Sequence, residues 1–272
     1  MSDDSRTPEQ LRRHYEVERE LAQRLLNSTR AERTALFRTL YDELFARVPD
    51  HPRKLRRDSP ETIKKAVAAR MALLQGKLEG VQTFIEFAPG DCTLAYEVCR
   101  HVNRVIGVDI SDQTGASSKA PPNFELVVYD GYNLNLPDAS ADLVFSYQFL
   151  EHLHPDDIEE HFRLVHRLLR PGGAYIFSTP HRFSGPHDIS RFFTDTPTGF
   201  HFKEWTYAEM TAMLKRIGFR SSHTYRFGKP RPCVCWTAAT LFLEFLFSLL
   251  PRKLQRRLSS RIFQAVTMAA IK

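Results

Sequence analysis

Residues 85–95 of the 272-residue chain, IEFAPGDCTLA, pass from a short apolar run through a turn of small residues into an expected helix. A turn of this kind at the carboxyl end of a strand lets a ligand approach the backbone closely. In open α/β sheets, ligands bind in the crevice outside the carboxyl ends of the strands. The segment therefore predicts an α/β fold in which Gly90 and its neighbours border a ligand site.

Beyond Val81, short apolar runs alternate with amphipathic segments, as in a parallel sheet with crossover helices. The expected strands are residues 82–87, 104–109, 124–129, 142–147, 173–179, 220–227 and 265–271. A helix is expected at 207–217, ended by Gly218, and roughly 35 extra residues precede the last strand. The predicted fold class is α/β, with a Rossmann-like, seven-stranded, mostly parallel sheet and helices on both faces.

The first 80 residues are expected to form a helical cap on a sheet domain that spans residues 81–272. One helix is expected from Pro8 to about Leu26. Thr29 and Glu32 then have the spacing of a capping box, in which each side chain bonds the other residue's backbone N–H. The apolar stripe of the next helix comprises Leu36, Phe37, Leu40, Tyr41, Leu44, Phe45 and Val48.

Residues 49–58 (PDHPRKLRRD) break the helical pattern and predict a mobile basic linker. Ser59-Pro60 then restarts a helix, with serine at the cap and proline in the first turn.

Acidic residues follow the next two expected strands. Asp109 lies 19 residues beyond Gly90, where a carboxylate can accept hydrogen bonds from both hydroxyls of a ribose. Asp130 ends the third strand, where it can accept from an adenine amino group while the next backbone N–H donates to a ring nitrogen. A dinucleotide fingerprint would need glycine at positions 88, 90 and 93, and the chain has glycine only at 90.

The order of the glycine turn, Asp109, Asp130, Glu151-His152 and the segment 170–173 (RPGG) resembles class I S-adenosylmethionine-dependent methyltransferases, especially the type 11-like bacterial group. The resemblance covers about residues 82–228 and implies S-adenosylmethionine as cofactor. It also implies the cofactor-binding set: Glu86, Ala88 and Gly90 at the methionine end, Asp109 at the ribose, and Asp130 with Gly131 at the adenine.

The chain departs from the family pattern at Ala88 and Cys92, which stand where the family has glycines. Alanine at position 88 is a mild change, because its methyl group can be accommodated if φ is negative there. The departures keep open a non-catalytic protein that binds S-adenosylmethionine or acts as a scaffold, since a fold does not secure a function.

Four histidines are expected around the acceptor: His152, His181, His187 and His201. A neutral histidine suits the removal of a proton from an oxygen acceptor at pH 7. His187 and His152 are the favoured catalytic residues, and Asp188 is a candidate orienting partner of His187, although adjacent side chains need not meet. For each histidine, a purely structural role stays open.

A metal site is the sharper alternative. Gln148-x-x-Glu151-His152 with a distal His201 looks like the Glu-x-x-Glu-His metal sites of small-RNA 2′-O-methyltransferases and ubiquinone-pathway O-methyltransferases. Here Gln148 replaces the first acidic residue and removes an anionic ligand from a site for a hard cation. The prediction is that no metal is required.

The apolar segment 233–250 is interrupted by a single charge, Glu244. A helix over 236–250 would be about 22 Å long at ~1.5 Å per residue, which is too short for a ~30 Å membrane core. Residues 229–272 carry eight basic residues and one acid, whereas residues 81–228 carry 13 and 18. Residues 233–261 are therefore predicted to contact an anionic membrane surface or an amphiphilic acceptor.

In this prediction, the inserting side chains are Leu241, Phe242, Phe245, Leu246 and Leu249, and the basic ones are Arg252, Lys253, Arg256, Arg257 and Arg261. An ordinary buried helix or a homodimer interface stays open.

The predicted function is methyl transfer to a small-molecule or lipid-linked acceptor, with oxygen as the expected methylated atom. An RNA 2′-O-methyltransferase is the alternative, but the net charge of −5 over residues 81–228 argues against a nucleic-acid partner. The polar start MSDDSRTPEQ shows no signal peptide, so a cytoplasmic location with membrane association is expected.

Overall fold

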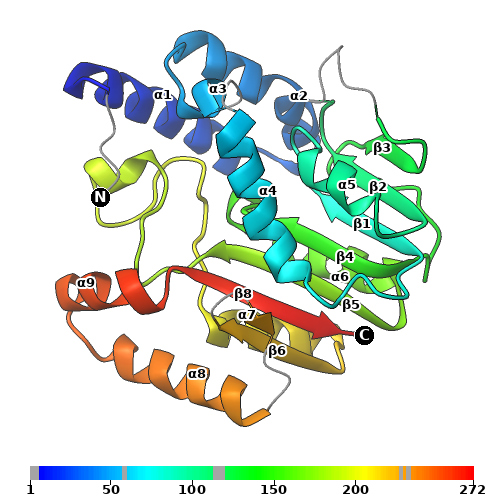
Figure 1. The fold of residues 1–272 in the computed structure, drawn as a ribbon. Helices are drawn as coiled ribbons and strands as arrows, with labels where there is room; N and C mark the ends of the chain where they lie inside the picture. Colours follow the sequence, from blue (N-terminus) through cyan, green and yellow to red (C-terminus); the bar gives the residue numbers. More distant parts are fainter. Residues whose placement is uncertain (1–5, 57–59, 113–119, 227–228, 231–233) are drawn as a thin grey trace.

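A computed structural model of the chain describes residues 6–56, 60–112, 120–226, 229–230 and 234–272. Its strands are β1 (Thr83–Phe87), β2 (Arg104–Asp109), β3 (Phe124–Val128), β4 (Ala141–Tyr147), β5 (Leu169–Pro180), β6 (Ser221–Arg226), β7 (Lys229–Pro230) and β8 (Ala265–Ile271). They form one sheet in the order β3-β2-β1-β4-β5-β8-β6-β7 (Figure 1). All seven strands expected from the sequence are present, and the two-residue β7 is added at the edge.

The central part of the sheet is parallel, and β8 runs antiparallel to both of its neighbours, β5 and β6. The fold is therefore the Rossmann-like arrangement that the sequence predicted. Because β1 lies between β2 and β4, the carboxyl ends of these three strands meet at one edge. That edge carries the turn after β1, Asp109 at the end of β2, and Tyr147 at the end of β4.

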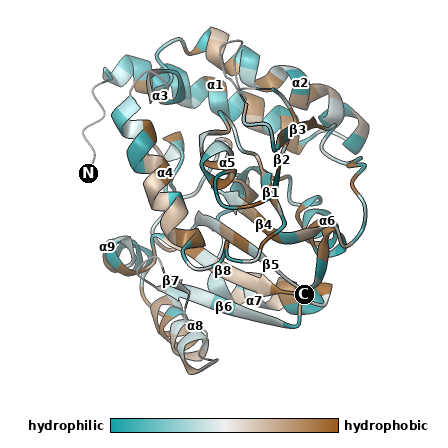
Figure 2. Cartoon of the chain, turned by 45° about the vertical axis from the view of Figure 1, so that its right-hand side comes forward, coloured by the Kyte–Doolittle hydropathy of each residue, from teal (hydrophilic) through white to brown (hydrophobic). Residues whose placement is uncertain are grey.

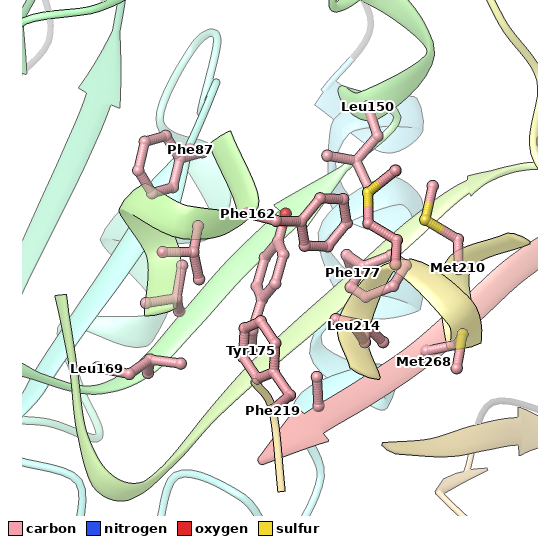
Figure 3. Packing of buried hydrophobic residues seen from close by; sticks show 14 of the residues in the cluster. Phe87, Leu150, Phe162, Leu169, Tyr175, Phe177, Met210, Leu214, Phe219 and Met268 are labelled. Atoms are coloured by element: carbon pink, nitrogen blue, oxygen red, sulfur yellow. The ribbon is translucent and has the colours of Figure 1, made fainter. Parts of the chain in front are cut away.

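Both faces of the sheet are buried, which explains why its strands are nearly continuous apolar runs. On one face, α4 (Pro60–Leu74) and α5 (Thr93–Val98) pack with Phe84 and Phe145. On the other, α6 (Ile158–Leu168) and α7 (Tyr207–Ile217) pack with Phe87, Tyr175 and Phe177 (Figure 3). Neighbouring strand residues thus point into opposite cores, as the two-residue period of a strand requires.

The N-terminal helices are α1 (Pro8–Leu26), α2 (Arg30–Arg47), the short α3 (Pro52–Arg56) and α4, and the first three lie above the sheet (blue in Figure 1). Capping boxes begin both α1 and α2, and the one between Thr29 and Glu32 is as predicted. Residues 52–56 form a helix where the sequence predicted a mobile linker. Ser59, the expected cap of α4, lies outside the described residues, whereas α4 does begin at Pro60.

The segment before β8 forms two helices, α8 (Val234–Ser248) and α9 (Arg252–Ile262), at one corner of the molecule (orange in Figure 1). Glu244 attaches α8 to the domain: its carboxylate is 3% exposed and accepts hydrogen bonds from the backbone N–H groups of Tyr207 and Ala208. A carboxylate at a helix N-terminus satisfies unpaired N–H groups and stabilises the helix dipole. The single charge in the apolar segment is therefore an anchor for α7.

Candidate functional site

A cavity of about 1200 Å³ lies at the carboxyl ends of β1, β2 and β4. The turn after β1 forms its floor, and residues from α1 to α4 line the opposite side, including Glu18, Phe37, Tyr41 and Arg70. Ligand pockets commonly measure ~300–1,000 Å³, so the space is large enough for a nucleoside cofactor together with an acceptor. The helical cap therefore forms one wall of the cavity, whereas the site residues predicted from the sequence all lie in the sheet domain.

The turn after β1 adopts left-handed backbone conformations. Ala88 has a φ of 52° and Cys92 a φ of 58°, so the negative φ under which alanine would be a mild change at position 88 is not found. Left-handed φ values cost a non-glycine residue of the order of 1–2 kcal/mol, and such strain concentrates at functional sites. The turn therefore has left-handed backbone at Ala88, Gly90 and Cys92, although only Gly90 can adopt it without strain.

Asp109 is 6% exposed and lies beside this turn. One carboxylate oxygen accepts from the N–H groups of Ile110 (2.7 Å) and Ser111 (3.3 Å), and the other accepts a long bond from Gly90 N (3.4 Å). Burial raises the pKa of Asp109, and the three backbone bonds oppose that shift. The weakly bonded Oδ2 is the atom best placed to accept from a ribose hydroxyl.

Glu86 lines the same cavity and is 2% exposed, and its Oε2 has no hydrogen-bond partner. Burial raises its pKa to about 8, and the charge of Arg70 limits the shift. An unpaired buried carboxylate oxygen is costly unless a ligand supplies a donor. Glu86 therefore fits the ammonium group of an amino-acid ligand such as the methionine end of S-adenosylmethionine.

Asp130 and Gly131 are adjacent in the chain, but their surroundings differ. The carboxylate of Asp130 accepts from Tyr132 N, Asn133 N and the Asn133 side chain, and these bonds lower its pKa. Gly131 does line the cavity, with a φ of 91°, and a Cβ there would lie 2.8 Å from Phe37 of α2. In this geometry Asp130 shapes the loop, while Gly131 and Phe37 form the surface available to an adenine.

His152 is the predicted base whose free nitrogen is best defined. Its Nδ1 lies 2.9 Å from the carbonyl oxygen of Phe200, which can only accept, so Nδ1 carries the proton. Burial, with the nearby His201, lowers the pKa of His152 to about 3. The ring is thus neutral at pH 7, and Nε2 has a lone pair available in the cavity that His152 lines.

His187, the other predicted base, has both ring nitrogens beside protein groups. Nε2 lies 3.1 Å from Ser184 Oγ, and Nδ1 lies 3.3 Å from a carboxylate oxygen of Glu204. Asp188, its expected partner, instead accepts from the backbone N–H groups of Ser190 and Gly199. The prediction of Asp188 as the orienting group was therefore wrong, and Glu204 occupies that position.

Glu204 also binds His201, at 3.0 Å from Nδ1. Although burial would raise the pKa of Glu204, its bonds with His187 and His201 lower it to about 2. His201 shows the opposite balance: burial lowers its pKa, but Glu204 and the nearby Glu151 and Asp188 raise it overall. Sequence reasoning missed Glu204 as an organising residue because one of its two histidine partners, His187, lies 17 residues away in the chain.

Glu151, His152 and His201 each offer one ligand atom within 4.8 Å of the others. Glu151 is fully buried, and its Oε1 has no hydrogen-bond partner while Oε2 accepts from Thr179. Glu204, Glu151 and Asp188 favour the imidazolium form of His201, because each raises its pKa. The structure thus brings together Glu151, His152 and His201, the residues of the metal alternative. Position 148, where the metal sites that this segment resembles have an acid, is a glutamine and adds no negative charge.

His181, the fourth histidine, lies outside the cavity wall. It is fully buried, its Nε2 bonds Glu244 at 2.7 Å, and its Nδ1 accepts from Phe183 N. Burial lowers its pKa despite the carboxylate. These contacts indicate a structural role for His181, which links the end of β5 to α8.

Residues 85–177 match a family described as a methyltransferase domain. A probable S-adenosylmethionine-dependent methyltransferase of Mycolicibacterium smegmatis is 37% identical over 123 residues, 44% of this chain and 45% of that protein. One of Mycobacterium tuberculosis is 34% identical over 118 residues, 43% of this chain and 40% of that protein. The matched region thus spans less than half the length of these curated relatives.

Solved structures share the fold over more of the chain. The 1,6-didemethyltoxoflavin-N1-methyltransferase of Burkholderia thailandensis, with bound S-adenosylhomocysteine, covers 90% of this chain and 91% of its own at 17% identity, with a TM-score of 0.56. A methyltransferase of Archaeoglobus fulgidus covers 79% of this chain and 96% of its own at 20% identity, with a TM-score of 0.51. Together these findings show that residues 85–177 are similar to a methyltransferase domain and to S-adenosylmethionine-dependent methyltransferases, and that the chain has the fold of such enzymes.

Proposed function

We propose that the protein transfers a methyl group from S-adenosylmethionine to an oxygen atom of a small-molecule or lipid-linked acceptor. The observation that carries this proposal is that a single cavity is lined both by the predicted cofactor-binding residues and by a candidate base. It brings the cofactor-binding set of Glu86, Gly90 and Asp109 together with His152, a neutral histidine whose Nε2 is free to accept a proton.

When bound, S-adenosylmethionine supplies an electrophilic methyl group on a sulfonium. The acceptor oxygen forms the new bond to that methyl carbon, the carbon–sulfur bond breaks, and its electron pair stays on sulfur. His152 Nε2 takes the hydroxyl proton, which a positioned base can do with a contribution of ~10²- to 10⁴-fold to the rate. The carboxylate of Glu151, within 4.8 Å of the histidine ligand atoms, stabilises the imidazolium that results.

The acceptor side of the cavity supports an amphiphilic acceptor. Ile189, Phe192 and Phe202 line this side, and Phe192 is 42% exposed at its rim. The chain from Arg182 to Asp195, which includes Phe192, contacts α9, because Arg252 donates to the backbone carbonyls of Arg182, Gly185 and Asp195. This segment would therefore connect an acceptor held at α9 with the wall of the cavity.

That surface has the composition of a membrane contact. On α9 the apolar residues Leu254, Leu258 and Ile262 are exposed, whereas the polar Gln255 and Ser259 are buried against the domain. On α8, Phe242, Phe245, Leu246 and Leu249 are exposed by 42–67%, and Figure 2 shows the mixed hydropathy of both helices. No helix in the described ranges is long and apolar enough to cross a bilayer. We therefore infer that α8 and α9 lie on an anionic membrane surface.

Not every residue expected at that surface reaches it. Leu241 is half-buried and packs against the core of the sheet domain. Arg252 is occupied by backbone carbonyls, and Arg256 pairs with Asp195 at 3.3 Å. The surface charge available to lipid headgroups thus comes from Lys253, Arg257 and Arg261, which lie one helical turn apart on α9 beside its exposed leucines.

Calorimetry on the purified protein tests the cofactor assignment. We expect micromolar binding of S-adenosylmethionine and S-adenosylhomocysteine and no binding of NAD, because Ala88 and Thr93 replace two glycines of the dinucleotide fingerprint. NAD binding without adenosylmethionine binding would overturn the proposal. Binding without turnover of any hydroxylated amphiphile would favour the non-catalytic alternative.

A further inference from the structure

A carboxylate of the helical cap is bonded to the loop that carries Phe200. Glu18 of α1 is buried, and its Oε1 accepts a hydrogen bond from the backbone N–H of Phe200 at 2.9 Å. Its Oε2 lies 2.8 Å from His14 Nε2. The guanidinium of Arg6, which can only donate, lies 2.7 Å from His14 Nδ1, so His14 carries its proton on Nε2 and donates it to Glu18. The Glu18 carboxylate is therefore held on both of its oxygens.

The carbonyl group of the same residue, Phe200, accepts from His152 Nδ1 at 2.9 Å. The N–H and the carbonyl of Phe200 belong to the two peptide groups that flank its Cα. Because each peptide group is planar, a partner that fixes the N–H also limits the directions open to the carbonyl. The Phe200 side chain is held by the cap as well, since it is buried in one apolar cluster with Leu21 of α1 and Leu44 of α2. Glu18 and His152 thus bond the two ends of one residue that the cap holds.

Gly199 leaves room for the approach of Glu18. A Cβ at position 199 would overlap Glu18 Oε1 and would lie 2.7 Å from a carboxylate oxygen of Asp188. The backbone N–H of Gly199 donates to that Asp188 oxygen at 3.0 Å. The φ of Gly199 is outside the left-handed region, so the residue is needed for this close approach and not for an unusual backbone conformation.

We propose that Glu18 is a positioning residue for His152: through Phe200 it holds the carbonyl that keeps the histidine proton on Nδ1 and leaves the Nε2 lone pair for the acceptor. Which ring nitrogen of a histidine carries the proton is set by the hydrogen bond that the other nitrogen makes or lacks. Without the charge-assisted bond from Glu18, the Phe200 carbonyl is free to turn away, and both neutral tautomers of His152 become populated. The inference rests on the proposed function, in which His152 is the base, and extends it to α1 of the helical cap.

Nitrogen-15 NMR of histidine-labelled protein distinguishes the two neutral tautomers of His152 and requires no acceptor. The signals of His152 are assigned by their absence from His152→Gln. We expect the wild-type protein to show the Nδ1–H tautomer alone. Glu18→Met keeps the volume of the side chain but removes the carboxylate, and it should show a mixture of both tautomers. Glu18→Gln keeps an oxygen for the N–H of Phe200 and should stay close to wild type.

Two further variants separate positioning from a general loss of structure. Gly199→Ala keeps the carboxylate but displaces it, so it should give the same mixture as Glu18→Met, and it preserves the test if that variant unfolds. Glu16→Ala removes an exposed carboxylate of the same helix and is the matched control. Turnover of any acceptor that the wild-type protein methylates should fall ~10- to 100-fold in Glu18→Met and Gly199→Ala, as misplacement of a catalytic group implies. Affinity for S-adenosylhomocysteine should stay within about twofold of wild type.

An unchanged Nδ1–H tautomer of His152 in folded Glu18→Met or Gly199→Ala would overturn the inference, and so would an Nε2–H tautomer in the wild-type protein. The proposed function fails on a different result. If His152→Gln methylates the acceptor as fast as wild type while the tautomer of His152 still depends on Glu18, the positioning contact stands and the role of His152 as the base must be withdrawn.

Discussion

The two favoured histidines differ in what their ring nitrogens face. His152 donates Nδ1–H to Phe200 and keeps Nε2 free, whereas His187 lies between Ser184 and Glu204. We expect His152→Ala to lower kcat by ~10²- to 10⁴-fold with little change in cofactor affinity. His187→Ala should keep kcat within about tenfold, because it loses only a positioning contact. Steady-state kinetics of both variants measures the difference, and the reverse order would move the base to His187.

A second expectation from individual residues is that turnover does not require a metal ion. Gln148 supplies no charge, and the carboxylates around His201 favour its protonated form, which cannot ligate a cation. We expect EDTA to leave turnover unchanged. If activity is lost in EDTA and returns with Mg²⁺ or Mn²⁺, then Glu151, His152 and His201 form a metal centre, and the role given to His152 must be withdrawn.

Among the elements, α9 is the most unusual, because its leucines face outward and its polar residues face the domain. We expect binding to phosphatidylglycerol vesicles that weakens but persists as salt rises, since apolar burial is insensitive to screening. Replacing Lys253, Arg257 and Arg261 with Gln should remove the salt-sensitive part, at about 1 kcal/mol per residue. Replacing Leu254, Leu258 and Ile262 with Ser should remove the remainder.

Vesicle co-sedimentation measures this binding. The matched control replaces three exposed lysines far from α9 in sequence, Lys64, Lys77 and Lys215, with Gln, and it should bind like wild type. Sedimentation of none of the proteins at low salt would rule out the membrane surface. A dimer in solution that the serine variant loses would instead assign these helices to a homodimer interface.

For the whole molecule, buried ionisable groups set how stability depends on pH. Burial raises the pKa of Glu86 to about 8 and of Glu151 to about 7, above the ordinary 4.5, so their contribution is lost as pH rises through those values. Burial lowers the pKa of His152 and His161 to about 3, below the ordinary 6.5, so their contribution is lost as pH falls below 6.5. Above pH 6.5 these two histidines no longer change stability, whereas His201, whose pKa is raised, loses its contribution in the same direction as the carboxyl groups.

The unfolding free energy should therefore fall by about 2 kcal/mol between pH 6.5 and pH 8. Glu86→Gln, which cannot ionise, should flatten this part of the curve and leave stability near pH 5 almost unchanged. Urea unfolding at pH 5, 6.5 and 8 measures it for both proteins. A wild-type curve that rises over this interval would show that Glu86 is ionised in the folded state.

The sequence alone determined the sheet, because the alternation of buried strands and amphipathic helices is a local pattern. It also placed Glu86, Gly90 and Asp109 at one site, since parallel strands bring their carboxyl ends to a common edge. The left-handed φ at Ala88 could not be predicted, because it depends on how the turn bonds to Val108 of the neighbouring strand.

The remaining features were decided by the tertiary structure. The pairing of Glu204 with His187 joins two separate loops, and the exposed apolar side chains of α9 depend on which face of that helix the domain covers. A sequence records the residue types available for such contacts. Which of them meet depends on how the cap, the sheet and the last helices pack together, and that packing places residues of α4 in the wall of the cavity.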